Sequence, residues 1–226
     1  MNVVITGCSR GIGLELVKKF TNEGHKVFGI SRNIQPLNQL SISSNLLFPF
    51  SFDIYKGDYQ ELWRSVSSFF DQIDIVINNA GQIVNKPFDE INADDLQKSY
   101  GTNVFGPIYI VQCLNRIFSN KAHIVNIGSM GGFQGSQKFA GLAAYSSAKA
   151  ALSCLTECLQ EEYSAKKWSF NCLCLGAVQT EMLNEAFPGY KAPHDPREMA
   201  SFIYGFSVGS GEYFKGKVLP VSTSSP

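Results

Sequence analysis

The stretch NVVITGCSRGIGLELVKKF, residues 2–20, decides how this chain folds. Its apolar, β-branched run VVIT is typical of a buried parallel strand, and apolar residues then recur at helical spacing over residues 11–20. The strand therefore passes into a helix through a turn that contains Gly7, Gly11 and Gly13. A helix N-terminus offers unpaired N–H groups and a partial positive charge, and glycines let a pyrophosphate approach that backbone. The turn predicts a dinucleotide-binding site, with an ordinary tight turn as the simpler alternative.

The rest of the chain repeats the order of strand and helix. Strand-like runs lie near residues 2–6, 26–30, 46–53, 73–81, 122–129, 170–178 and 216–221. Amphipathic segments lie between them, near residues 11–23, 58–70, 94–119, 144–165 and 195–208. This repetition predicts an α/β fold: a single doubly wound Rossmann-type domain over residues 1–226, with a seven-stranded parallel sheet and helices on both faces.

Composition excludes several classes of partner. Lys plus Arg and Asp plus Glu both total 19, so the net charge is zero, and without a basic block we expect no nucleic acid. No leader-like start and no apolar run of ~18 residues is present, so we expect no membrane partner and a cytoplasmic location. The six cysteines complete no metal-ligand pattern, and buried free thiols without a metal are expected. Seventeen Phe with only 17% charged residues favour a pocket or a subunit contact.

The end of the second strand indicates which dinucleotide is bound. A fold that selects NAD normally places Asp or Glu there for the ribose 2′-hydroxyl, but this chain has Ser31 and Arg32. Arg10 lies inside the glycine turn, so two guanidinium groups are predicted to converge on a ribose 2′-phosphate. One charge-assisted contact of ~1.5–3 kcal/mol would favour NADP(H) over NAD(H) by roughly 10- to 100-fold. Two solvated surface arginines are the alternative.

The order of the motifs resembles that of the short-chain dehydrogenase/reductase family. The motifs are TGCSRGIG at 6–13, FDI at 52–54, NNAG at 78–81, Asn103, Ser129 and YSSAK at 145–149, and the resemblance covers residues 2 to about 182. The same Tyr-x-x-x-Lys spacing occurs at 163–167 and 213–217. Only Tyr145 also has a Ser after the fifth strand and an upstream helical Asn, so the other two pairs are predicted to be decoys.

The resemblance implies a catalytic tetrad of Asn103, Ser129, Tyr145 and Lys149. Tyr145 would donate a proton to a carbonyl oxygen that Ser129 holds, while NADPH delivers hydride to the carbon. Lys149 would bind the nicotinamide ribose and lower the Tyr145 pKa, and Asn103 would support a water chain. A phenol of pKa near 10 must shift by ~3 units to work near neutrality, and a nearby cation supplies ~1–3 units.

The cofactor-binding set combines the residue patterns with the resemblance. Asp53 and Ile54 would hold the adenine, the Asn79–Gly81 backbone the ribose, and Val178 with Thr180 the nicotinamide carboxamide. Strand-end turns need small or capping residues in any case, which is the structural alternative for each. The set comprises Gly7, Ser9, Arg10, Gly11, Ile12, Gly13, Ser31, Arg32, Asp53, Ile54, Asn79, Ala80, Gly81, Tyr145, Lys149, Val178 and Thr180.

The sequence departs from the family in ways that bear on the substrate. Leu175 stands where the family usually has Pro, which loosens the backbone beside the nicotinamide without removing a reacting group. Substrate loops are expected at about 83–90, 130–143 and 181–196. Their apolar residues predict a compact, uncharged or aromatic carbonyl substrate: Ile83, Val84, Phe88, Phe133, Phe139, Met182, Leu183 and Phe187.

These observations favour an NADP-dependent oxidoreductase that interconverts a small carbonyl compound and its alcohol. A non-catalytic NADPH-binding sensor or scaffold, and an epimerase or dehydratase on the same fold, stay open as alternatives. We expect a homodimer or homotetramer. The short segment after the last strand favours a dimer through the helices at 94–119 and 144–165.

Overall fold

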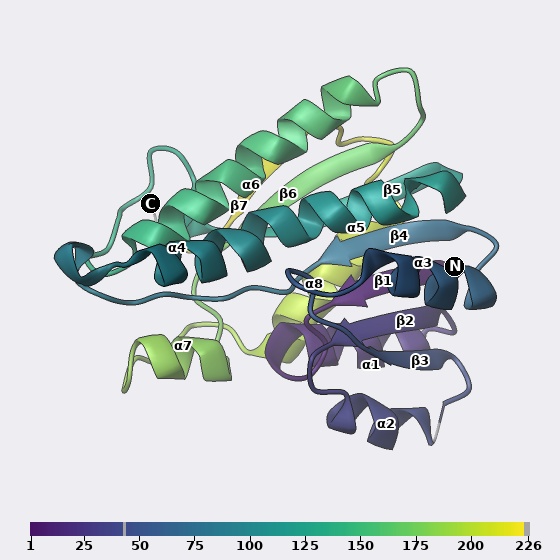
Figure 1. Ribbon diagram of the computed structural model, residues 1–226, viewed down its shortest axis with the longest axis horizontal. Helices are drawn as coiled ribbons and strands as arrows, with labels where there is room; N and C mark the ends of the chain where they lie inside the picture. Colours follow the sequence, from purple (N-terminus) through teal and green to yellow (C-terminus); the bar gives the residue numbers. More distant parts are fainter. Residues whose placement is uncertain (43, 224–226) are drawn as a thin grey trace.

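The computed structural model describes residues 1–42 and 44–223, and over these residues the strands form one parallel sheet (Figure 1). The order across the sheet is β3-β2-β1-β4-β5-β6-β7. The strands are β1 Asn2–Thr6, β2 Lys26–Ser31, β3 Leu47–Ser51, β4 Ile73–Asn78, β5 Phe118–Ser129, β6 Ser169–Leu175 and β7 Lys217–Val221. The predicted doubly wound α/β fold with seven parallel strands is therefore confirmed for the described residues.

The helices form a layer on each face of the sheet (Figure 1). Buried side chains from α1 and α8 share one core cluster with Leu37 of α2, and those from α3 and α5 share the other. Helix α6 packs on β5 and β6 on the same side as α4. The helices are α1 Gly11–Asn22, α2 Gln35–Ser41, α3 Tyr59–Phe69, α4 Ala93–Tyr100, α5 Gly106–Leu114, α6 Ala143–Glu162, α7 Glu181–Ala186 and α8 Pro196–Gly209.

The alternation of side chains along β1 explains why both layers are needed. Val3 and Ile5 point into the cluster under α1 and α8, whereas Val4 points into the cluster under α3 and α5. Successive residues of a strand face opposite sides of a sheet. All three side chains are fully buried, so this strand is apolar on both faces and requires a helical cover on each.

The helix expected at 94–119 is not one regular helix. It consists of α4, a π-helical segment at Gly101–Phe105, α5 and a short 3₁₀ turn, and β5 already begins at Phe118. Two short helices were not expected, α2 and α7, which have seven and six residues. Helices of this length carry too few apolar repeats to be recognised from periodicity.

The cysteines only partly match the expectation of buried thiols. All six are free; Cys8, Cys172 and Cys174 are buried and Cys113 is half-buried, but Cys154 and Cys158 are exposed on α6. The expectation of burial was wrong for these two because their shared helix face points away from the sheet. In residues 1–42 and 44–223, no helix is long and apolar enough to span a membrane. Part of the tail considered for subunit contacts, 224–226, lies outside the described residues.

Candidate active site

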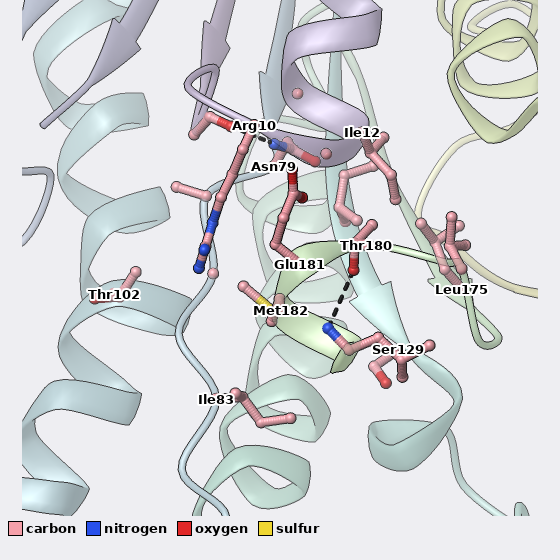
Figure 2. Close-up of a pocket in the computed structure, with 18 of the residues that line it drawn as sticks. Arg10, Ile12, Asn79, Ile83, Thr102, Ser129, Leu175, Thr180, Glu181 and Met182 are labelled. Carbon is pink, nitrogen blue, oxygen red and sulfur yellow. Dashed lines mark hydrogen bonds between the residues drawn. The ribbon is translucent and has the colours of Figure 1, made fainter. Parts of the chain in front are cut away.

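The candidate site is a cavity of about 720 Å³ at the carboxyl ends of the strands (Figure 2). It lies where the strand order changes direction, between β1 and β4. The chain leaves β1 toward α1 on one face and leaves β4 toward α4 on the other, which opens a crevice at this point. Every residue predicted to bind the cofactor lines this cavity.

The glycine turn is packed so closely that no larger side chain fits. Gly7 has a φ of +73°, and a Cβ there would lie 2.6 Å from the Ala80 Cα atom. A Cβ at Gly13 would lie 2.1 Å from the Gly7 carbonyl oxygen. The Asn79 amide, visible in Figure 2, donates to the carbonyl oxygens of Thr6 and Gly7 at 3.0 and 3.1 Å. The loops after β1 and β4 are thus locked together, with backbone facing the cavity.

The end of β2 carries no acidic residue in the cavity wall. Ser31 is buried there as the last residue of the strand, and Arg32 follows it, exposed, in the same lining. Asp53 reaches the lining from the loop after β3, and its Oδ1 accepts hydrogen bonds from the backbone N–H groups of Tyr55 and Lys56 at 2.9 and 3.3 Å. The Asp53 carboxylate therefore shapes its own turn.

Arg10 does not stand free in the cavity. Its Nη1 lies 2.5 Å from Glu185 Oε1 and its Nη2 lies 3.3 Å from Glu185 Oε2, so the guanidinium holds the carboxylate with two hydrogen bonds. The hydrogen bond raises the Arg10 pKa, burial opposes this, and the same bond lowers the Glu185 pKa. Sequence reasoning missed Glu185, because a pair 175 residues apart leaves no local pattern.

Tyr145 and Lys149 lie one helical turn apart near the start of α6. The Lys149 Nζ is 5.9 Å from the centre of the Tyr145 ring and donates a 2.7 Å hydrogen bond to the Ile127 carbonyl oxygen. Ser129, the last residue of β5, accepts a hydrogen bond from the Gly131 N–H and is hydrogen bonded to Tyr145. The strand β5 and the helix α6 thus bring a hydroxyl, a phenol and an amine to one end of the cavity.

Burial dominates the protonation of this pair. Burial raises the Tyr145 pKa, and the hydrogen bond with Ser129 opposes that rise. Burial lowers the Lys149 pKa to about 8, and the neighbouring thiols Cys172 and Cys174 oppose that fall. In the protein alone, Tyr145 is therefore a protonated phenol at neutral pH, the form that donates a proton.

Asn103 is fully buried in the π-helical segment and lies behind the cavity wall. Its Nδ2 donates to the carbonyl oxygens of Gln82 and Ser99, both at 2.8 Å. A Cβ added at Gly81 would lie 3.2 Å from Asn103 Oδ1 and 3.6 Å from Lys149 Nζ. Gly81, Asn103 and Lys149 are therefore close neighbours, and a Cβ at Gly81 would press on the Asn103 side chain. A π-bulge at this point is typical of functional sites.

The other two Tyr-x-x-x-Lys pairs lie outside the cavity lining. The Tyr163 hydroxyl accepts a 3.1 Å hydrogen bond from Asn115, and its ring stacks on Phe170. Tyr213 is 81% exposed just before β7. Of the three pairs in the described chain, only Tyr145 with Lys149 faces the cavity.

The substrate-facing wall matches the expected residues in part. Ile83, Phe139, Met182, Leu183 and Phe187 line the cavity. The expectation was wrong for three residues that lie outside the lining, of which Phe88 is 76% exposed: Val84, Phe88 and Phe133. Leu175, expected beside the nicotinamide, also lines the cavity, as do five further residues of the expected substrate loops: Met130, Gly131, Leu142, Glu181 and Tyr190. Sequence reasoning did not assign the remaining lining residues a place in the site: Asn33, Phe52, Thr102, Ile127, Gly128, Gly176 and Ala177.

Residues around α7 connect the predicted cofactor-binding residues of the cavity wall with the predicted substrate-binding ones. Thr180 caps the helix, since its Oγ1 accepts a 3.2 Å hydrogen bond from the Leu183 N–H, drawn dashed in Figure 2. Val178 pairs with His194 in a short parallel bridge. Leu175, which stands where the family usually has Pro, is the last residue of β6. Its side chain is buried and packs in the core beneath α1 and α8.

The three expected substrate loops meet at Asn85. Its Nδ2 donates a 2.7 Å hydrogen bond to the Ala186 carbonyl oxygen at the end of α7. The next residue, Lys86, donates its N–H to the Gly141 carbonyl oxygen at 3.0 Å. Segments from 83–90, 130–143 and 181–196 are therefore joined around the cavity mouth.

Comparison with known proteins gives consistent matches. A family model described as short chain dehydrogenase matches residues 1–191. An uncharacterised oxidoreductase of Staphylococcus epidermidis is 28% identical over 183 residues, which are 79% of this chain and 78% of that protein. A serine dehydrogenase solved with NADP+ superposes with a TM-score of 0.86 at 23% identity, covering 100% of this chain and 97% of that one. A 3-ketoacyl-(acyl-carrier-protein) reductase from Brucella melitensis solved with NADH also gives 0.86, at 22% identity, covering 97% and 96%.

Proposed function

This protein belongs to the short-chain dehydrogenase/reductase family, and we propose that it is an NADP(H)-dependent oxidoreductase that interconverts a small carbonyl compound and its alcohol. The observation that carries the proposal is the meeting of Ser129, Tyr145 and Lys149 at one end of a cavity whose other end is a glycine turn. The alternative of a non-catalytic NADPH sensor or scaffold is tested below.

The glycine turn fits the pyrophosphate of a dinucleotide. A Cβ at Gly7 or Gly13 would overlap neighbouring backbone, so the turn is free of side chains at these points, and no side chain caps the N–H groups at the start of α1. Such groups bind anionic oxygens, assisted by the partial positive charge of the helix end. The NADP(H) preference rests on Arg10 and on Ser31 with Arg32, which take the place of an acid at the end of β2.

The bound cofactor supplies or accepts the hydride, and the residues of this chain handle the proton and the orientation. In reduction, the Ser129 hydroxyl holds the carbonyl oxygen. The Tyr145 hydroxyl gives its proton to that oxygen as the carbonyl carbon gains the hydride, so the products are an alcohol and a tyrosinate. A proton from water then restores the phenol, and Asn103, whose Nδ2 donates to the Gln82 carbonyl oxygen behind the cavity wall, is the residue expected to support that water. In the reverse direction, the tyrosinate takes the alcohol proton.

Lys149 stabilises the tyrosinate when protonated. With a pKa of about 8, most Lys149 side chains are protonated at neutral pH. The Lys149 Nζ atom lies 5.9 Å from the centre of the Tyr145 ring. Burial raises the Tyr145 pKa in the protein alone, so the Lys149 charge would need the help of the positive charge that an oxidised nicotinamide would supply. Proton transfer by a positioned side chain typically contributes 10²- to 10⁴-fold to the rate.

The lining favours a compact apolar substrate. Ile83, Met182, Leu183 and Phe187 contribute aliphatic and aromatic surface near the reacting end, and Phe139 and Tyr190 stand half-exposed. Large exposed aromatic side chains beside a pocket commonly cover an apolar ligand. A small or aromatic aldehyde, ketone or quinone fits this wall.

A dimer through α4, α5 and α6 fits the exposed surface of these helices. Leu96, Phe105 and Tyr109 are 44%, 39% and 38% exposed on α4, the π-helical segment and α5. Cys154 and Cys158 are exposed on α6, which packs beside α4. Apolar groups gathered on adjacent helices are typical of a subunit contact.

The test of the proposed function is Tyr145→Phe. If the protein is an enzyme, this variant reduces a panel of carbonyl compounds with NADPH at least 100-fold more slowly. Its affinity for NADPH, measured by nicotinamide fluorescence, stays nearly unchanged. Tyr163→Phe, which removes a phenol of the same motif outside the cavity, is the control and keeps its turnover. Tight NADPH binding without turnover by the unaltered protein would support the sensor, and binding of neither NADPH nor NADH would refute the cofactor assignment.

A further inference from the structure

We propose that Glu185 sets the cofactor preference of this site by competing with the ribose 2′-phosphate for Arg10. The inference rests on the proposed function, because it requires that the cavity takes a nicotinamide dinucleotide. It concerns a residue that lies outside the cavity lining, and it assigns that residue a role in specificity.

The ion pair occupies the donors that a phosphate would use. Arg10 contacts both carboxylate oxygens of Glu185, at 2.5 and 3.3 Å, in the two-bond geometry by which guanidinium also binds phosphate. A guanidinium that holds a carboxylate in this way has to release it before it binds a phosphate with the same two nitrogens. Each partner is half-exposed, at 48% and 59%, so the pair is weak enough to be exchanged.

Arg10 is positioned to contact either Glu185 or the expected 2′-phosphate. It precedes α1 in the glycine turn and lines the same cavity as Ser31 and Arg32, the expected 2′-phosphate end. Its extended side chain runs along the cavity next to Glu181 in Figure 2. A 2′-phosphate carries more negative charge than a carboxylate, so it draws Arg10 away from Glu185. A 2′-hydroxyl has no charge and does not.

The exchange also reaches the substrate side. Glu185 lies in the last turn of α7, and the carbonyl oxygen of the next residue, Ala186, accepts the hydrogen bond from Asn85. The C-terminal end of α7 is thus tied to the glycine turn on one side and to a substrate loop on the other. Binding of NADPH removes the first tie, whereas binding of NADH leaves it in place. The two cofactors therefore leave α7 with different restraints beside the substrate wall.

The experiment is a titration of NADPH and NADH, followed by nicotinamide fluorescence at low salt, on the unaltered protein and on Glu185→Gln. Glutamine keeps the size of the side chain and removes the charge. We expect the ratio of NADPH affinity to NADH affinity to be about 2- to 5-fold higher in Glu185→Gln than in the unaltered protein. This is the change that the loss of an exposed ion pair implies.

Two variants control for charge. Glu212→Gln breaks the ion pair with Lys121, which has the same 2.5 Å length and also lies on the surface, outside the cavity lining. It should leave both affinities unchanged. Glu181→Gln removes a charge that acts on Arg10 through space, so it should favour NADPH over NADH by less than Glu185→Gln does. In an Arg10→Gln background, Glu185→Gln should no longer change the ratio of the two affinities.

The outcomes separate this inference from the proposed function. Equal changes for NADPH and NADH in Glu185→Gln, or weaker binding of both, would overturn the competition while leaving the dinucleotide assignment intact. A change in the ratio that persists in the Arg10→Gln background would overturn it as well. If the unaltered protein binds neither cofactor, the proposed function fails and the inference fails with it.

Discussion

Replacement of Gly13 by Ala tests the reasoning that connects the glycine turn to the fold. A Cβ at this position would lie 2.1 Å from the Gly7 carbonyl oxygen and 2.5 Å from the Asn79 amide nitrogen. Real Cβ atoms essentially never approach a neighbour within 3.0 Å, so the start of α1 must move by about 0.9 Å. The first obstacle is backbone, which cannot rotate away as a side chain would.

The displacement costs more than the helix gains. Leu16, Val17 and Phe20 of α1 are fully buried against the sheet and α8, so a shift of α1 disturbs a packed core. Overpacking of this kind typically costs ~1–3 kcal/mol, and Ala in place of Gly returns at most ~1 kcal/mol of helix propensity. We expect Gly13→Ala to lose about 2 kcal/mol of unfolding free energy. With a urea m-value of ~1–3 kcal/mol/M, the midpoint falls by roughly 0.7–2 M.

The assay is urea unfolding followed by circular dichroism, together with NADPH titration of the folded variant. Gly205→Ala is the matched control, because Gly205 lies inside α8 and, apart from its two chain neighbours and the backbone of its own helix, no heavy atom lies within 4 Å of the added Cβ. That variant should gain ~0.5–1 kcal/mol and bind NADPH unchanged. The reasoning is refuted if Gly13→Ala unfolds at the same urea concentration as the unaltered protein and binds NADPH as tightly.

Two further predictions concern pH. Burial lowers the His123 pKa from about 6.5 to about 4, so the unfolded chain binds more protons between these values, and stability falls by up to ~1.4 kcal/mol per unit as the pH drops from 6.5 toward 4. The urea midpoint should therefore fall less steeply with decreasing pH in His123→Asn than in the unaltered protein. Identical pH dependence in the two chains would mean that His123 has its ordinary pKa in the folded protein. Burial likewise lowers the Lys149 pKa to about 8, so stability should rise between pH 8 and about 10.4 relative to Lys149→Met. A constant difference between the two chains over that range would contradict the lowered Lys149 pKa.

The elements predicted best were those whose pattern is local. The strands at 2–6 and 26–30 and the helix at 11–23 agree with β1, β2 and α1 within one residue, because β-branched runs and helical apolar spacing are visible in one turn or strand. The segment at 94–119 was predicted as one helix, since nothing in its periodicity marks the π-helical segment that turns Asn103 inward. The short helix α7 was missed for the same reason, although Thr180 is a typical capping residue.

The site shows the same division between local and distant information. The sequence motifs already contained the glycine turn, the Tyr145–Lys149 pair and the replacement of an acid by Ser31 and Arg32. Each of these lies within a few neighbouring residues, so the order of the chain specifies it. The fold confirmed by the structure then follows from the repeated strand and helix, because a buried parallel strand needs helices on both faces.

Only the tertiary structure decided which charged groups pair and which residues line the cavity. The pairing of Arg10 with Glu185 joins residues 175 positions apart, and the meeting of Asn85 with Ala186 joins residues 101 apart. The cavity lining also excluded Phe88, whose side chain points to solvent. Such contacts depend on how packed elements place their ends. The sequence by itself therefore determined the fold and proposed the candidate reacting groups, whereas the folded chain determined which residues contact them, because contacts are set by distance in space.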